Sequence, residues 1–187
     1  MSQRKETKVA VIVVDMQTAM LEAGSAVRLD GSEQLVAKAQ QVLAWARAAE
    51  GAAVCFVRHD DAEAGAALAP DSPGWRVLDA LGQRAAEPTF AKSVGNAFSN
   101  PALGAWVGAR PVLLLGAQSD MCVDATATAA LALGLKVAVV SDAHGTVAYG
   151  GSTANQIIAL HNAKWRDAGA VLVSADDLDN LASLLSE

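Results

Sequence analysis

Short, continuously apolar runs rich in valine and isoleucine recur along this 187-residue chain and alternate with segments of helical periodicity. These runs, each predicted to be a strand, cover residues 8–15, 52–57, 112–116, 136–141 and 170–173. Strands that are apolar on both faces are typical of a parallel sheet covered by helices on either side. The pattern therefore predicts an α/β fold.

The segments between these runs complete the predicted order of elements. Apolar residues recur at helical spacing over residues 32–50, and Gly51 follows in the position of a C-terminal cap. Residues 58–87 form a loop-rich excursion, and a short strand is predicted at 88–91. Further helices are predicted over residues 75–81, 101–108, 122–133, 153–167 and 176–185. Right-handed βαβ units then give a three-layer α/β/α Rossmann-like fold. We expect about six parallel strands in the order 3-2-1-4-5-6, within one domain over residues 1–187.

Composition and charge narrow the classes of partner. The net charge is −6 and the 14 Lys and Arg residues are scattered, which argues against a nucleic-acid partner. Residues 1–8 are polar, and the apolar run after them is too short for a signal sequence or a membrane span. Cys55 and Cys122 lie in different predicted elements, with no spacing typical of a disulfide framework or a zinc site. We expect a cytoplasmic protein with no membrane partner.

Cys122 lies where an apolar strand gives way to a predicted helix that starts at the cysteine. The positive end of a helix dipole lowers a thiol pKa, so we expect a thiolate nucleophile here. Asp15 and Lys92 also come at the ends of predicted strands. In a doubly wound sheet the ligand crevice lies at the carboxyl ends of the strands, where the strand order reverses. The order 3-2-1-4-5-6 therefore brings Asp15 and Cys122 to one crevice.

Three motifs carry a resemblance to a known family: VVDMQ at 13–17, FAK at 90–92 and GAQSDMCV at 116–123. Together with residues 140–146 and 157–162, they resemble the signatures of the isochorismatase-like cysteine hydrolases. The resemblance implies a catalytic triad of Asp15, Lys92 and Cys122. It also implies cleavage, without a cofactor, of a C–N bond in a small amide, ureido or carbamoyl substrate through a thioester, by a homodimer or larger homo-oligomer.

Two other functions stay open at this point. An isochorismatase-type enzyme hydrolyses a vinyl ether with the aspartate and the lysine and needs no thiol. A non-catalytic binding or assembly protein would have kept only the fold. Cys122 favours the amidase interpretation over the first, and the intact triad favours it over the second.

Further site residues follow from the resemblance and from position. The resemblance places an oxyanion hole at the backbone N–H groups of Gln118 and Cys122, with a cis peptide bond between Ala117 and Gln118. Gln17 is predicted to orient Asp15 or to contact the substrate. Trp75 and Phe90 are predicted to line the substrate pocket, since such pockets are mostly apolar and aromatic.

The remaining histidines and the second cysteine are given no catalytic role. His59 precedes two aspartates, as in the metal sites of nicotinamidases, but its loop holds no second histidine, so no metal is predicted. His144 either reaches the edge of the crevice or makes structural hydrogen bonds, and the sequence leaves this open. Cys55 lies inside an apolar strand and is predicted to be core.

Overall fold

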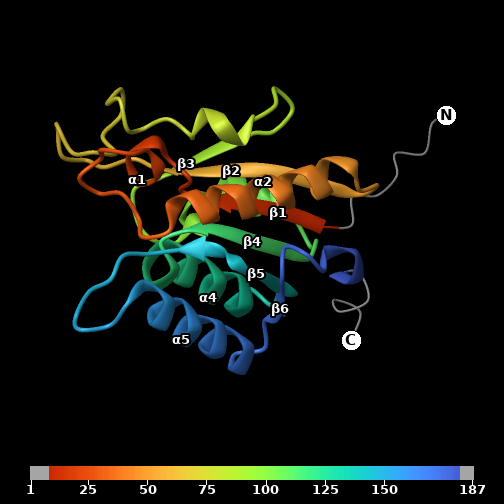
Figure 1. The fold of residues 1–187 in the computed structure, drawn as a ribbon. Coiled ribbons are helices and arrows are strands. Elements are labelled where there is room, and N and C mark those ends of the chain that lie inside the picture. The colour runs from red at the N-terminus through yellow and green to blue at the C-terminus, as the bar shows by residue number, and fades with distance from the viewer. Residues whose placement is uncertain (1–8, 182–187) are drawn as a thin grey trace.

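The computed structural model describes residues 9–181, and its centre is a parallel sheet of six strands (Figure 1). The strand order is β3-β2-β1-β4-β5-β6, which confirms the predicted 3-2-1-4-5-6 topology. The strands are β1 (Val9–Val14), β2 (Ala52–His59), β3 (Thr89–Lys92), β4 (Val112–Ala117), β5 (Val137–Gly145) and β6 (Val171–Val173). All neighbouring pairs run parallel.

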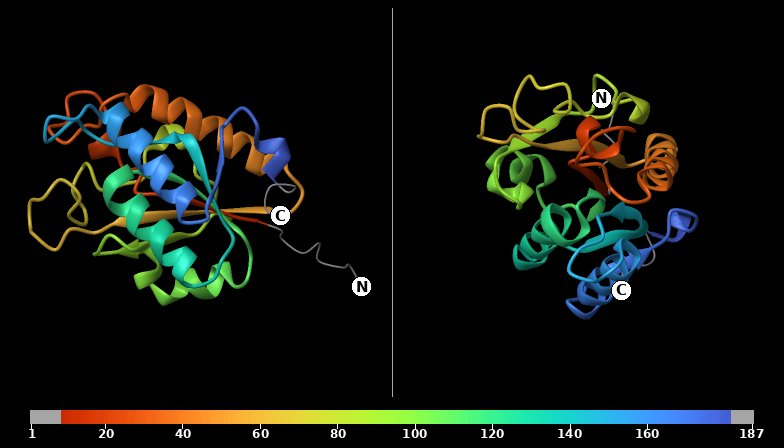
Figure 2. Two further views of the ribbon diagram at one scale, coloured as in Figure 1. Left: turned by 90° about the horizontal axis from the view of Figure 1, so that it is seen from below. Right: turned by 60° about the vertical axis from the view of Figure 1, so that its left-hand side comes forward.

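Helices cover both faces of the sheet, as expected for the three-layer architecture. They are α1 (Thr18–Leu21), α2 (Ser32–Ala48), α3 (Pro101–Val107), α4 (Asp124–Ala132) and α5 (Ala154–Asp167). Figure 2 shows α2 on one face and α3, α4 and α5 on the other. Successive residues of β1 alternate between two core clusters: Val11 and Val13 pack in the cluster with α2, and Ile12 and Val14 pack in the cluster with α3 and α4. This alternation explains why β1 is apolar at every position.

Three predicted helices differ from the structure, and the one predicted to start at Cys122 is described with the site below. The predicted helix at residues 75–81 is only a 3-10 turn, Asp79–Leu81. The backbone before this turn bonds instead to the segment that follows β1. Thr18 N donates to Arg76 O, and Leu78 N donates to Met16 O. The predicted helix at 176–185 begins with a 3-10 turn, Leu178–Asn180, and its residues 182–185 lie outside the described part of the chain. Within residues 9–181, no helix combines the length and apolarity that crossing a bilayer requires.

Gly116 in β4 allows the two central strands to approach closely at their carboxyl ends. Its φ is +127°, and a Cβ atom built there would lie 2.0 Å from the carbonyl oxygen of Val14 in β1. Only glycine tolerates both this conformation and this approach. The close contact brings the end of β4 against the end of β1, where Asp15 follows.

Candidate active site

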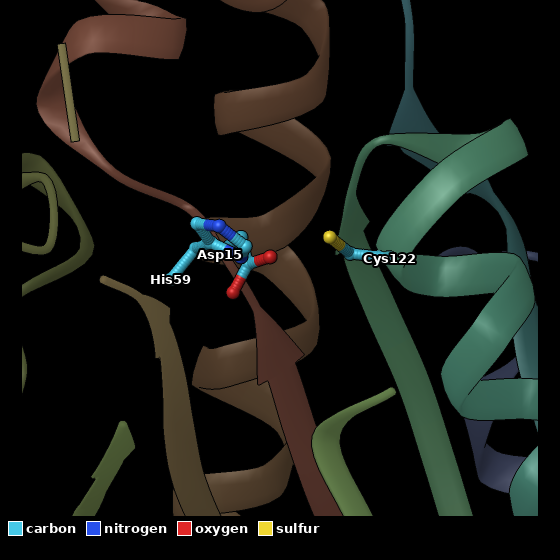
Figure 3. Close-up of side chains that lie close together, drawn as sticks. All are labelled: Asp15, His59 and Cys122. Atoms are coloured by element: carbon cyan, nitrogen blue, oxygen red, sulfur yellow. The ribbon is translucent and has the colours of Figure 1, made fainter. Parts of the chain in front are cut away.

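The carboxyl ends of β1, β2, β3 and β4 bring four side chains into one cluster. Asp15 directly follows β1, and Lys92 is the last residue of β3. The register of β2 and β3 sets His59 opposite Lys92. Cys122 comes from the turn after β4, and in Figure 3 its sulfur points toward Asp15 and His59. Residues far apart in the sequence therefore meet because parallel strands end at the same edge.

Asp15 has an unusual backbone conformation, and its carboxylate contacts the Lys92 ammonium. Its φ is +48°, in the left-handed region that aspartate tolerates better than most residues. The side chain is buried, and Oδ2 accepts a hydrogen bond of 2.7 Å from Lys92 Nζ. Among residues 9–181, Oδ1 has no hydrogen-bond partner although it is buried. Burial raises the pKa of this carboxyl, and the neighbouring Lys92 opposes the rise.

The Lys92 ammonium lies at the centre of the cluster. Its side chain is 0% exposed, so no solvent competes for its N–H groups. Besides Asp15, Nζ lies 3.2 Å from Cys122 Sγ and 3.1 Å from His59 Nδ1. An ammonium has three N–H donors, and each has an acceptor here.

Cys122 differs from the sequence-based expectation in two respects: its position in the helix, and the direction in which its thiol pKa is shifted. A π-helical turn, Ser119–Val123, precedes α4, so the cysteine is the fourth residue of a helical turn and not the start of a helix. Burial and the neighbouring Asp15 carboxylate raise the pKa of the Cys122 thiol to about 12, and Lys92 offsets only part of this. This direction is opposite to the lowered thiol pKa expected from the helix dipole.

The π-helical turn is supported from β5 by His144. Asn162 Nδ2 donates to Ser141 O, which leaves Asn162 Oδ1 to accept from His144 Nε2 at 3.1 Å. His144 Nδ1 then accepts from Ser119 Oγ at 2.8 Å. His144 is 3% exposed, and burial lowers its pKa to about 4. Its role is thus structural, which settles the question that the sequence left open.

The peptide bond between Ala117 and Gln118 is cis, as the resemblance implied. It joins the last residue of β4 to the residue before the π-helical turn.

The residues predicted to bind substrate take different places. Gln17 is fully buried, and its amide bonds the backbone of His59 on both sides and the carbonyl of Trp75. It therefore ties the segment after β1 to β2, and its amide is engaged by backbone groups. The Trp75 indole donates to Asp60 Oδ1, with the Arg58 guanidinium 3.6 Å above its ring centre. Partly buried Phe90 packs at 5.9 Å from the Trp106 ring.

His59 is the site residue that sequence reasoning missed. The available signal was its position, because it ends its strand as Lys92 ends β3. Asp15, His59 and Cys122 also present ligand-type atoms within 4.8 Å of one another. A metal ion bound by these atoms would have to displace the Lys92 ammonium, which already contacts all three.

Comparisons with known proteins find relatives of this chain in sequence and in fold. Two streptothricin hydrolases from Streptomyces noursei are 37% and 34% identical to this chain over 140 residues, which is 73% of the chain. Those residues are 49% and 54% of the two relatives, so the chain spans about half the length of the curated relatives it matches.

Solved structures share the fold across nearly the whole chain. A cysteine hydrolase from Pseudomonas syringae pv. phaseolicola superposes with a TM-score of 0.82 at 20% identity, covering 96% of this chain and 92% of its own. An isochorismatase family protein from Desulfovibrio vulgaris gives 0.81 at 24% identity, covering 95% and 100%. The family model of the isochorismatase domain matches residues 9–177. The chain therefore belongs to the isochorismatase family.

Proposed function

We propose that this protein is a cysteine hydrolase that cleaves a C–N bond in a small amide, ureido or carbamoyl compound. The observation that carries the proposal is the meeting of Asp15, Lys92 and Cys122, with one buried carboxylate oxygen of Asp15 left without a partner. A thiol with a raised pKa needs a base beside it, and that free oxygen supplies one. The names of the two relatives, which act on streptothricin, further support a hydrolase.

The first half of the reaction forms a thioester. Asp15 Oδ1 accepts the thiol proton as Cys122 Sγ attacks the substrate carbonyl carbon, and Lys92 stabilises the developing negative charge on sulfur. Asp15 then returns this proton to the leaving nitrogen as the C–N bond breaks. Ammonia or an amine departs, and the acyl group stays on the sulfur.

The second half releases the acid. A water molecule gives a proton to Asp15 and its oxygen attacks the thioester carbon, after which the C–S bond breaks and the proton returns to sulfur. Negative charge gathers on the substrate oxygen in both halves. We assign its stabilisation to the backbone N–H groups of Gln118 and Cys122, which border and occupy the π-helical turn.

Ammonia release from a panel of small amides, ureido compounds and carbamoyl compounds, together with streptothricin hydrolysis, tests this proposal. We expect Cys122→Ala and Asp15→Asn to lose activity by at least about 10³-fold, since both remove a group that changes bonds in the reaction. Cys55→Ala is the matched control, because this second cysteine is buried in β2, away from the cluster.

The same panel separates the alternatives. Turnover that survives Cys122→Ala would contradict the thioester route and favour hydrolysis of a vinyl ether, which requires only the aspartate and the lysine. Absence of turnover on every compound, with Cys122 no more reactive toward iodoacetamide than in Asp15→Asn, would indicate a binding protein.

We also propose that the protein is a cytoplasmic homodimer or larger homo-oligomer whose partner is another copy of the chain. Large apolar side chains are exposed on connections that follow the carboxyl ends of strands: Val27, Val94, Met121 and Tyr149. Met121 is 58% exposed and neighbours the nucleophile. Light scattering should find an oligomer, and Met121→Lys should shift it toward monomer; a monomeric parent protein would refute this.

A further inference from the structure

We infer that His59 is a positioning residue for Lys92. In this role it accepts the third N–H of the ammonium through Nδ1 and so keeps another N–H aimed at the Cys122 sulfur. This inference rests on the proposed function, because it concerns how the thiolate is stabilised. His59 does not contact the reacting atoms in this role and acts only through Lys92.

Each of the three N–H donors of Lys92 Nζ is paired with its own acceptor. Nζ donates to Asp15 Oδ2 at 2.7 Å and to Cys122 Sγ at 3.2 Å, which uses two of its donors. The third meets His59 Nδ1 at 3.1 Å. Because the lysine side chain is completely buried, water cannot replace any of these acceptors. Loss of the imidazole acceptor would leave a buried charged donor unpaired, which is costly.

The same contacts determine the tautomer of His59. Lys92 is a donor only, so Nδ1 must be unprotonated and the ring proton must lie on Nε2. Nε2 lies 3.3 Å from Asp61 Oδ1, so the protonated end of the ring faces a carboxylate. The imidazole thus has the Lys92 ammonium at one nitrogen and the Asp61 carboxylate near the other. This arrangement resembles the way an outer carboxylate orients a metal-bound histidine.

The backbone of His59 is as closely held as its ring. The buried Gln17 amide accepts from His59 N at 2.8 Å and donates to His59 O at 3.0 Å. On the other side, the parallel register of β2 and β3 pairs His59 with Lys92. Two constraints independent of the ring therefore place Nδ1 at the ammonium.

Two amide substitutions separate this role from simple packing. In His59→Asn the side-chain oxygen falls near the position of Nδ1, so it can accept from Lys92. In His59→Gln the amide extends to the position of Nε2 and leaves Lys92 without this acceptor. Both variants remove the ring, and they differ mainly in where the acceptor lies.

The first readout is the rate of iodoacetamide labelling at Cys122, followed by intact mass, since it needs no substrate. We expect His59→Gln to slow labelling by about tenfold or more and His59→Asn to stay within about threefold of the parent protein. In turnover, kcat should fall for His59→Gln while KM stays unchanged. Thermal unfolding of each variant identifies any loss of fold.

The outcomes distinguish this inference from the proposed function. Equal labelling of both amide variants, whether fast or slow, overturns the role of Nδ1 while Asp15→Asn and Lys92→Met still report on the triad. If those two triad variants label as fast as the parent, the proposed function itself fails. Long-range ¹H–¹⁵N spectra of the unmodified protein give a test that needs no variant: a His59 proton on Nδ1 would overturn the inference.

Discussion

The buried His144 should make the stability of this protein depend on pH in a calculable way. Its ring is neutral, with Nε2–H bonded to Asn162 and Nδ1 accepting from Ser119. Burial lowers its pKa from the ordinary 6.5 to about 4. Below pH 6.5 the unfolded chain therefore binds a proton at this position that the folded protein does not. The free energy of unfolding must fall as the pH falls through this window.

The magnitude follows from the size of the shift. Over the full interval from 6.5 to about 4, the linkage amounts to about 3 kcal/mol, and about 2 kcal/mol of it is lost between pH 7 and pH 5. His144→Asn removes the titration and retains an acceptor for Ser119. The difference in stability between parent and variant isolates this histidine, because other groups titrate in both proteins.

The assay is urea unfolding of both proteins at half-unit steps from pH 4 to pH 8. We expect the stability advantage of the parent to be constant above pH 7, to shrink as the pH falls and to level off near pH 4. A difference that does not change with pH would refute a buried, neutral His144. A difference that grows on acidification would mean that the folded protein binds the proton more tightly.

Three further substitutions test the packing around the site. Gly116→Ala should lower the free energy of unfolding by at least about 3 kcal/mol, because its Cβ would lie 2.0 Å from Val14 O. Gly104→Ala, where α3 leaves the added methyl open space, should instead stabilise by about 0.5–1 kcal/mol. Trp165→Phe removes a 2.9 Å hydrogen bond to Asp124 and should cost about 2 kcal/mol. Each is measured by chemical unfolding. An unchanged midpoint would contradict the close approach at Gly116, the helix-propensity gain at Gly104 or the hydrogen bond of Trp165, respectively.

The sheet was predictable because its strands are buried on both faces. The continuous apolar runs 8–15 and 112–116 match β1 and β4, and their alternation with helices predicted the parallel sheet. The strand order came from the order typical of a Rossmann-like fold, which the structure confirms. The meeting of Asp15 and Cys122 followed from the rule that functional groups gather at the carboxyl ends of strands. The inclusion of Lys92 in the triad came from the resemblance to the isochorismatase-like cysteine hydrolases.

What the sequence did not reveal depends on contacts between distant segments. The role of Gln17 lies in hydrogen bonds to His59 and Trp75, and no local pattern encodes these. The segment at 75–81 has a helical pattern, but its backbone partners lie in the loop after β1. Burial and the neighbouring Asp15 together raise the pKa of the Cys122 thiol. The helix-dipole argument alone therefore gave the wrong direction for this pKa.

The short β3 strand bears on whether activity or helical structure is lost first during unfolding. With only four residues and a neighbour on one side, it is one of the two edge strands of the sheet, yet it supplies Lys92. Fraying of such a margin costs less free energy than melting the whole fold. Mild denaturant should therefore inactivate the protein while circular dichroism still reports intact helices. The denaturant concentration at which activity is lost would then depend on the edge strand β3 and not on the core.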